Sequence, residues 1–480
     1  FILVLILLGL IALCVMVYQL DRQEFNLAFI NIGWDYFQVL SMFSDADVDW
    51  PPTLKSLYRV LSVFSFDIDV VAPECLIPGF PYVTKFYMAI YSPIICCGIL
   101  MFTWLCTLTY EHVIRGTPWR NRDKFLGSRY TATFLLMLYF LYVTVTRQAL
   151  EIFNCNPLPG AYDGYLYTEF TSFDCDSGPC RCDDPRHIQM QLKTPALVAI
   201  VGMTFGFPAG MLILLRSKKL LIKEDQLLRA AGIGNTVETS SNFAVYQIRV
   251  ALHKMYYHFL PGKSFWIIFI IARKGAIAAA ALIFRANPGF QLSTVVLVLF
   301  IAYVLQVKHK PYMSTSQRQE ALADHALKAK EGDPEHVRIH ERIKNARSYV
   351  AGKRKNSIRR GKGDVKFGRY GLADGKGKHF GYRKKEQRHY FWDYNTVEQV
   401  LLASAILVAL AGVMFESDRF ENDKSGAYAW QRDLITYLIL VVVFFSLTYY
   451  MIVFVFEIYG KTPEVIARMW GAARFRNRKS

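Results

Sequence analysis

The chain has 480 residues, of which 53% are hydrophobic and 15% aromatic, and its formal net charge is +17. The basic residues lie mainly between long apolar segments, so the charge is mainly a signal of membrane topology. No nucleic acid is expected as the main partner, and nucleic-acid binding is a secondary possibility. The sequence contains no glycine-rich phosphate loop and no nucleophile elbow. We therefore expect no enzyme, no cofactor and no metal site.

Long apolar segments recur along the chain, and a helix that crosses a bilayer core needs roughly 20 mostly apolar residues. The segments are residues 1–18, 86–110, 130–150, 194–215, 264–284, 290–307, 396–415 and 433–457. They predict an all-α fold, a polytopic transmembrane helix bundle embedded in the lipid bilayer. Pro93 and the stretch 205–208 are expected to kink two of these helices.

Residues 25–43 leave the number of spans at eight or nine. They are nearly long enough to cross the bilayer, but they contain Asn31 and Asp35 and are also compatible with an interfacial helix. A crossing would place residue 1 outside the cell, and an interfacial position would place it inside. Because Phe1 lies within an apolar run and is not Met, we expect the chain to be a piece of a longer polypeptide.

The charge of the loops alternates along the chain and sets the orientation. Basic loops follow residues 110, 215 and 307 and are expected in the cytoplasm, whereas the acidic loops at 44–85, 151–193 and 416–432 are expected outside. We divide the chain into five predicted regions. Residues 1–85 hold the first span or spans and an acidic extracellular loop, and residues 86–308 hold transmembrane helices with a Cys-rich extracellular loop at 151–193. Residues 309–395 are a basic cytoplasmic insert, residues 396–458 the last two transmembrane helices, and residues 459–480 a basic cytoplasmic tail.

Cysteines gather in the loops assigned to the outside, where disulfides persist. Because their number is odd, they form at most two bridges among themselves, and their spacing is not a recognised zinc pattern. The disulfide candidates are Cys75, Cys155, Cys175, Cys180 and Cys182.

Two charged residues fall inside the fifth apolar segment. Arg273 and Lys274 lie about 15 Å along a helix that begins at Ser264, near the bilayer midplane. Charges at this depth are costly and need partners inside the bundle. Glu398 is the first candidate partner and Glu457 the second. The pair fits either a structural ion pair or a role in transport or gating.

The insert 309–395 divides into two parts. Residues 316–331 and 334–350 predict a helical hairpin broken at 332–334. Beyond Ala351 the sequence is basic and glycine-rich and cannot form a core. We expect it to bind anionic lipid headgroups, and RNA or an acidic protein is the alternative partner. The lipid-binding candidates are Lys353, Arg354, Lys355, Arg359 and Arg360.

Several short sequence motifs resemble those of a known family. They are DYFQVLS at 35–41 with DWP at 49–51, SVFSFD at 62–67 leading to PEC at 73–75, Trp266 with ARK at 272–274, NPGFQ at 287–291 ending in KPY at 310–312, and NTVE at 395–398 ending in AGVMF at 411–415. Through them, residues 25–458 resemble the C-terminal multi-pass, TRP-like membrane module of large protist surface proteins with cysteine-rich GCC2/GCC3 (ephrin-receptor-like) repeats. The long basic insert departs from that pattern.

The resemblance implies an extracellular domain before Phe1, nine spans, and a location in the plasma or ciliary membrane. It also implies that Arg273, Lys274, Gln291 and Glu398 are structural signatures of the module.

Two functions fit this sequence. The first is a receptor-like or anchoring protein that ties an extracellular domain or assembly to the membrane and to cytoplasmic partners, alone or in an oligomer or larger membrane complex. The second is a TRP-like cation channel or a subunit of one. A pore of that type needs a re-entrant filter, and the linker at 285–289 is too short to hold one. The sequence therefore favours the receptor or anchor.

Overall fold

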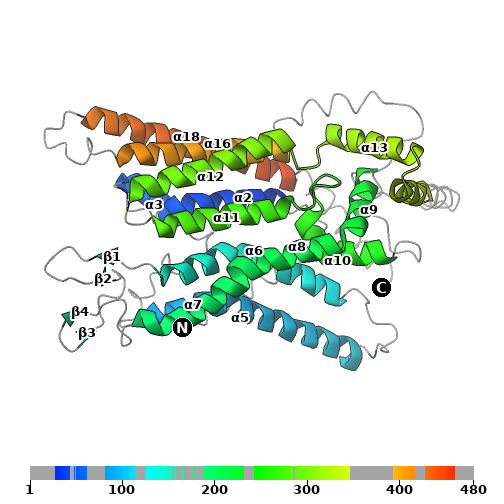
Figure 1. The fold of residues 1–480 in the computed structure, drawn as a ribbon, viewed down its shortest axis with the longest axis horizontal. Coiled ribbons are helices and arrows are strands. Elements are labelled where there is room, and N and C mark those ends of the chain that lie inside the picture. Colours follow the sequence, from blue (N-terminus) through cyan, green and yellow to red (C-terminus); the bar gives the residue numbers. More distant parts are fainter. Residues whose placement is uncertain are drawn as a thin grey trace, which may run out of the picture.

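The computed structural model describes residues 28–43, 48, 50–61, 82–114, 116, 126–153, 156–157, 165–166, 174–175, 178–179, 188–231, 243–284, 287–345, 393–416 and 428–459. The described chain is almost entirely helical, and its long helices lie side by side along one axis (Figure 1). The predicted span at 1–18, the lipid-binding candidates at 353–360 and the tail after residue 459 lie outside the described residues.

Six helices among the described residues are long and apolar enough to cross a membrane, as in an integral membrane protein. Their bounds are α5 Tyr82–Thr109, α6 Leu126–Glu151, α7 Ile188–Ala199 continuing into α8 Phe207–Ser217, α12 Pro288–His309, α16 Tyr394–Phe415 and α18 Ala429–Tyr459. Each corresponds to a predicted apolar segment. A π-helix, η4 Tyr110–Ile114, follows α5, and α5 continues through Pro93.

The predicted irregularity near Pro208 takes the form of a π-helix. This segment, η7 Ile200–Gly206, joins α7 to α8. Thr204 within it donates a hydrogen bond from Oγ1 to Thr146 Oγ1 of α6 at 3.2 Å, and its backbone carbonyl accepts one from Tyr142 Oη at 3.3 Å. The π-helical turn is therefore hydrogen-bonded to the neighbouring helix α6. Such turns are rare inserts in α-helices.

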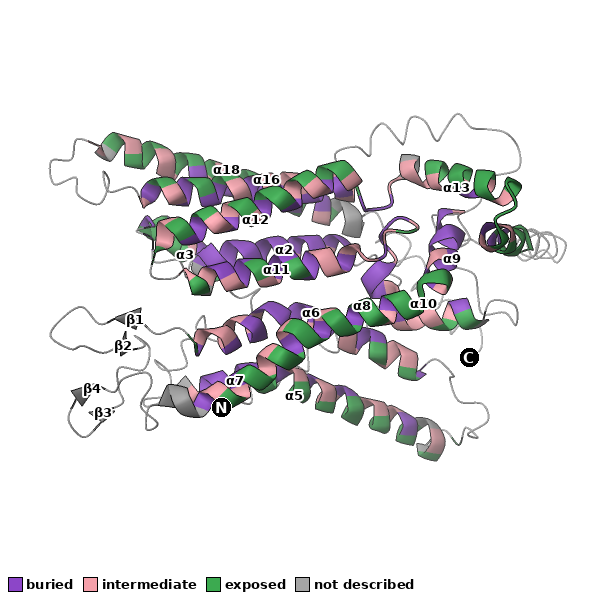
Figure 2. Cartoon of the chain, in the orientation of Figure 1, coloured by how far each residue is buried: buried purple, intermediate pink, exposed green. Residues whose placement is uncertain are grey.

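Two further helices occupy the interior of the bundle. Helix α2, Ala28–Met42, has 13 of its 15 residues buried, and α11, Trp266–Ile283, has 18 residues. Helix α2 contacts α11 and α16, and α11 also contacts α6 and α12. Figure 2 shows α2 as almost wholly buried, in contrast to the outer helices α5 and α18.

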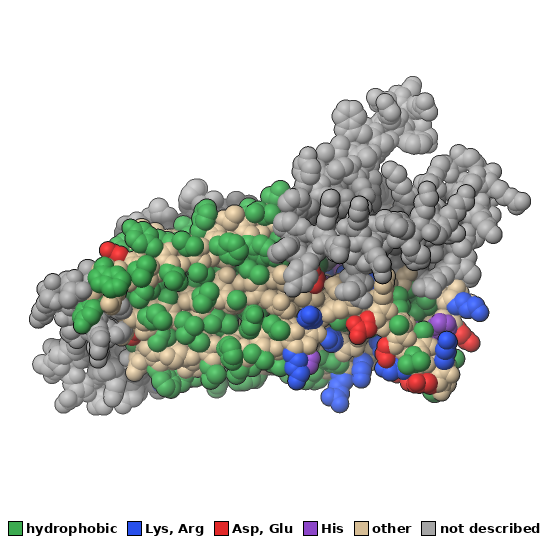
Figure 3. Space-filling view, turned by 90° about the horizontal axis from the view of Figure 1, so that it is seen from above, with side chains coloured by type: hydrophobic (Ala, Val, Ile, Leu, Met, Phe, Trp, Pro, Cys, Tyr) green, Lys and Arg blue, Asp and Glu red, His purple; other side chains and the backbone are tan. Residues whose placement is uncertain are grey.

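The outer surface of the bundle is apolar. Large hydrophobic side chains are exposed along α5, α8, α12 and α18, and examples are Phe102, Ile213, Phe300, Val441 and Phe444, each 53% exposed or more. In the space-filling view these side chains cover the long flank, whereas Lys and Arg gather toward one end (Figure 3). Such a contiguous apolar surface fits contact with lipid.

Shorter helices form a cap at the end of the bundle where Lys and Arg gather. They are α9 Lys219–Ala230, α10 Phe243–Tyr256, α13 Thr315–Lys330 and residues 334–345 (Figure 1). We call these four segments the platform. Leu227, Leu228 and Val245 pack against Ile339 and Ile343 in a small core. The first part of the predicted insert is thus packed on α9 and α10.

Local signals explain where several of these elements begin and end. Asn287 Oδ1 accepts a hydrogen bond from the backbone N–H of Phe290, and Pro288 provides the first residue of α12. Ser314 and Gln317 form a capping box at the start of α13. Gly332, at φ +85°, makes the turn of the predicted hairpin, and the second helix covers 334–345. Residues 346–350, predicted to extend it, lie outside the described residues.

The opposite end of the bundle carries α3 Pro52–Leu61 and two short antiparallel strand pairs. The pairs are β1 Asn156–Pro157 with β2 Tyr165–Leu166, and β3 Asp174–Cys175 with β4 Gly178–Pro179. They are a small departure from the predicted all-α fold and fall in the predicted Cys-rich loop. Cys175 lies in β3, but its side chain and Cys75, Cys155, Cys180 and Cys182 are outside the described residues.

Candidate functional site: a buried charge cluster

Four ionisable side chains from three helices meet in the interior of the bundle. Asp35 comes from α2, Arg273 and Lys274 from α11, and Glu398 from α16, and all four are at most 6% exposed. Two basic and two acidic groups leave the cluster with no net formal charge. We call these four residues the charge tetrad.

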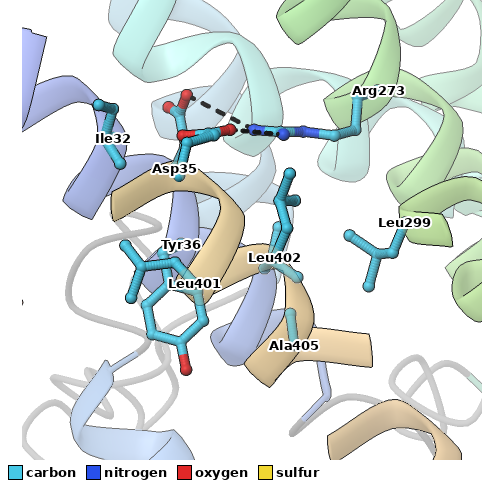
Figure 4. Close-up of a pocket in the computed structure, with 10 residues that line it drawn as sticks. Ile32, Asp35, Tyr36, Arg273, Leu299, Leu401, Leu402 and Ala405 are labelled. Carbon is cyan, nitrogen blue, oxygen red and sulfur yellow. Dashed lines mark hydrogen bonds and ion pairs between the residues drawn. The ribbon is translucent and has the colours of Figure 1, made fainter. Parts of the chain in front are cut away.

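Arg273 joins α11 to α16. Its Nη1 donates to Glu398 Oε1 at 2.7 Å, and its Nη2 lies 3.9 Å from Asp35 Oδ2 (Figure 4). The first contact is a charge-assisted hydrogen bond, and the second is a longer electrostatic contact. Arg273 therefore holds the two carboxylates of the tetrad in the same part of the bundle.

Lys274 joins α11 to α2. Its Nζ forms an ion pair with Asp35 Oδ1 at 2.6 Å and donates to Gln38 Oε1 at 3.0 Å. The same ammonium lies 4.0 Å from the centre of the Tyr139 ring, a cation–π contact. These contacts replace the water that the ammonium would have in solution.

Polar groups of α6 complete the surroundings of the tetrad. Tyr139 Oη donates to Asp35 Oδ2 at 2.6 Å, and Gln38 Nε2 donates to the Phe140 carbonyl at 3.1 Å. Asp35 is thus contacted by a phenol, an ammonium and a guanidinium. Additional contacts of this kind offset part of the cost of burying a charged pair.

A small cavity lies beside the tetrad. It is lined by Asp35, Arg273 and Glu398 on one side and by apolar side chains, including Leu299, Leu401 and Leu402, on the other (Figure 4). Its volume of about 10 Å³ is close to the room that one water requires. The Nε of Arg273 has no hydrogen-bond partner among the described residues. The tetrad is therefore a buried polar centre with room beside it for about one water.

The tetrad agrees with the sequence analysis in part. Glu398 was the first predicted partner, and the contact with Arg273 is confirmed. Glu457 lies in α18, and its side chain is outside the described residues. Gln291, implied by the resemblance as a signature residue, is 1% exposed, and its Oε1 has no hydrogen-bond partner among the described residues.

Sequence reasoning missed the partners of Lys274. Asp35 was treated as an obstacle to a membrane span, and Gln38 and Tyr139 were not singled out. A signal was present, because an acidic residue inside an apolar segment usually faces the interior of a bundle and a basic partner.

A second polar network joins the bundle to the platform. Residues 258–260 and 311–313 pair as extended chains, with Leu260 N donating to the Pro311 carbonyl at 2.8 Å and Met313 N to the His258 carbonyl at 3.0 Å. Asn395, at the start of α16, donates from Nδ2 to the Tyr312 carbonyl at 2.8 Å and accepts from Tyr312 N at 3.0 Å.

Helix α9 is fixed to the same junction. Gln226 Nε2 donates to the carbonyls of Tyr256 and Phe259 at 3.1 and 3.2 Å. Asp225 forms an ion pair with Arg249 Nη2 at 2.5 Å and accepts from Tyr256 Oη at 2.9 Å. Hydrogen bonds therefore join α9 and the connection after α10 to the connection after α12 and to the start of α16.

Comparison with known proteins gives no assignment: no family model, no curated protein and no solved structure matches this chain.

Proposed function

We propose that the chain is a multi-pass membrane protein of receptor-like or anchoring type, which ties an extracellular domain or assembly to cytoplasmic partners. The observation that carries this proposal is the junction between the bundle and the platform. Asn395 and the paired segments 258–260 and 311–313 fasten the platform to several membrane helices. A displacement of the bundle would therefore be passed to the platform.

The proposed topology has nine spans, with the platform in the cytoplasm. The buried position of α2 among α6, α11 and α16 supports its inclusion as a span, and so does the position of α11. Lys and Arg at the platform end of the described surface support the orientation (Figure 3). The location we propose is the plasma or ciliary membrane, as the family resemblance implies.

Several features favour an anchor over a TRP-like channel. The tetrad carries no net formal charge, and the cavity beside it has room for about one water. Helix α11 ends at Ile283 and α12 begins at Pro288, so the linker is too short for a re-entrant pore helix. An anchor needs neither a water-filled path for ions nor a re-entrant filter.

The first experiment measures conduction. The full chain, purified and reconstituted in liposomes, is expected to give cation flux and single-channel current no greater than those of protein-free liposomes. Cation-selective single-channel current above that of protein-free liposomes would establish the channel instead.

The second experiment measures anchoring. Deletion of residues 351–392 removes the basic part of the insert and retains the platform helices. We expect the full chain, tagged with a fluorescent protein, to have a larger immobile fraction in cell membranes than the deletion variant, measured by fluorescence recovery. Equal recovery of the two proteins would contradict anchoring through the insert.

A further inference from the structure

Three histidines meet in the platform, apart from the charge tetrad. His325 belongs to α13, and His336 and His340 lie one turn apart in the helix 334–345. The Nδ1 atoms of His325 and His336 are 2.7 Å apart, and the ring centres of His325 and His340 are 6.0 Å apart. His325 and His336 are buried, whereas His340 is exposed.

Neighbouring groups determine how the two buried rings carry their protons. Lys223 Nζ lies 3.1 Å from His336 Nε2. A lysine ammonium can only donate hydrogen bonds, so His336 Nε2 is the acceptor. His336 then donates from Nδ1 to His325 Nδ1, and the proton of His325 lies on Nε2. That Nε2 is buried and has no hydrogen-bond partner among the described residues.

In this arrangement His325 Nδ1 is the acceptor, so its lone pair points into the space between the two rings. A metal ion binds a nitrogen that carries a lone pair and no proton.

We propose that His325, His336 and His340 form a binding site for a divalent transition metal of the zinc class. Two histidines at i and i+4 present their rings on one face of a helix, a spacing used in zinc sites. The third ring comes from α13, the other helix of the same hairpin. Imidazole donors suit Zn²⁺, Co²⁺, Ni²⁺ and Cu²⁺, and the exposed side of His340 gives the ion a path to the site.

Binding requires a small movement of the rings. No three metal-ligating side chains among the described residues are already arranged around a common point. Two imidazole nitrogens on one tetrahedral zinc lie roughly 3.3 Å apart, given bonds of about 2.0–2.1 Å. The His325 and His336 Nδ1 atoms must therefore separate slightly from their present 2.7 Å, which side-chain rotation supplies.

The charged groups around the histidines accommodate this change. Asp333 Oδ2 lies 3.9 Å from His336 Nε2. Once His336 Nδ1 binds the metal its proton moves to Nε2, and a small shift of Asp333 would let its carboxylate accept a hydrogen bond from that N–H. Lys223 already forms an ion pair with Glu335 Oε1 at 2.8 Å and keeps that partner when it leaves His336. Asp324, which precedes His325, forms an ion pair with Lys328 at 2.7 Å.

Cobalt titration of the full chain tests the proposal. The protein is purified in detergent without a histidine tag, treated with a chelator and titrated with Co²⁺, and its visible absorption is recorded. We expect one Co²⁺ per chain, displaced by Zn²⁺, and a rise in the thermal unfolding temperature on addition of Zn²⁺. His336→Ala is expected to abolish the absorption bands, and His340→Ala to weaken binding by roughly tenfold or more.

The matched control is His253→Ala, which removes a histidine of α10 outside the cluster and should leave the titration unchanged. Thermal unfolding without metal checks that each variant is folded. If a folded His336→Ala protein binds Co²⁺ as the parent chain does, or if the parent chain gives no saturable binding, the site does not exist.

Discussion

At the scale of single residues, Asp35 has more partners in the tetrad and around it than Glu398, the other carboxylate. It pairs with Lys274 at 2.6 Å, accepts from Tyr139 at 2.6 Å and lies 3.9 Å from Arg273, whereas the direct ionic partner of Glu398 is Arg273. Removing one partner of a buried ion pair costs about 3–5 kcal/mol, because the other charge remains buried. The two carboxylates are therefore unequal in what their loss would cost.

We expect Asp35→Asn to lower the folded yield and the thermal unfolding temperature more than Glu398→Gln does. Substituting Lys274 by Met in the Asp35→Asn background should restore part of the loss, because it removes the uncompensated ammonium. Fluorescence-detected size exclusion and thermal unfolding in detergent measure both effects. Equal stability of all these proteins would mean that the tetrad is solvated.

His258, in the connection between α10 and α11, gives a prediction for the effect of pH. Its ring packs on Phe259 and Tyr312, and burial, with Arg229 and His253 nearby, lowers its pKa from 6.5 to about 3. The unfolded chain therefore binds a proton between these values that the folded chain does not, so stability falls as the pH drops below about 6.5.

The His258→Phe variant retains an aromatic ring but cannot titrate. Its unfolding temperature should fall less between neutral pH and about pH 5 than that of the parent chain. His325, with a pKa lowered to about 4, contributes the same trend and remains in the variant. An unchanged pH dependence would show that His258 is not buried as a neutral ring.

At the scale of elements, the close approach of helices depends on particular glycines. An added Cβ at Gly412 of α16 would lie 2.6 Å from Trp50 Cη2 and 2.7 Å from Leu292 Cδ1 of α12. Helix packing in membranes uses such small residues because lipid provides little hydrophobic drive for association. Gly98 of α5, in contrast, has no atom within 4 Å of an added Cβ.

Gly412→Ala is expected to destabilise the bundle by about 1–3 kcal/mol through overpacking. Gly98→Ala is the matched control and should be neutral or slightly stabilising, because alanine favours a helix by up to about 1 kcal/mol over glycine. Thermal unfolding in the same detergent compares the two variants. Equal shifts would contradict the close contact between α12, α16 and Trp50.

At the scale of the whole molecule, topology can be tested by accessibility. We expect a short epitope inserted between residues 417 and 427 to bind antibody on intact cells, and one placed after Ser480 to bind only after permeabilisation. Charge alternation along the sequence supports this, since acidic loops are expected on the side opposite the basic loops. Exposure of both tags on the same side would mean that α18 does not cross the membrane.

The sequence alone determined the apolar helices and their order, because a chain in lipid must satisfy its backbone hydrogen bonds within each helix. The Arg273–Glu398 contact was also predictable, since a charge in an apolar segment needs an opposite one. The sequence also signals that Asp35 needs a basic partner, but it does not identify Lys274 and Tyr139 as its neighbours. Those side chains meet across 239 and 135 residues of chain, and the rotation of each helix about its axis decides which of them face one another. Only the tertiary structure decided these contacts and the packing of the hairpin against α9, since both depend on side-chain fit between segments distant in sequence.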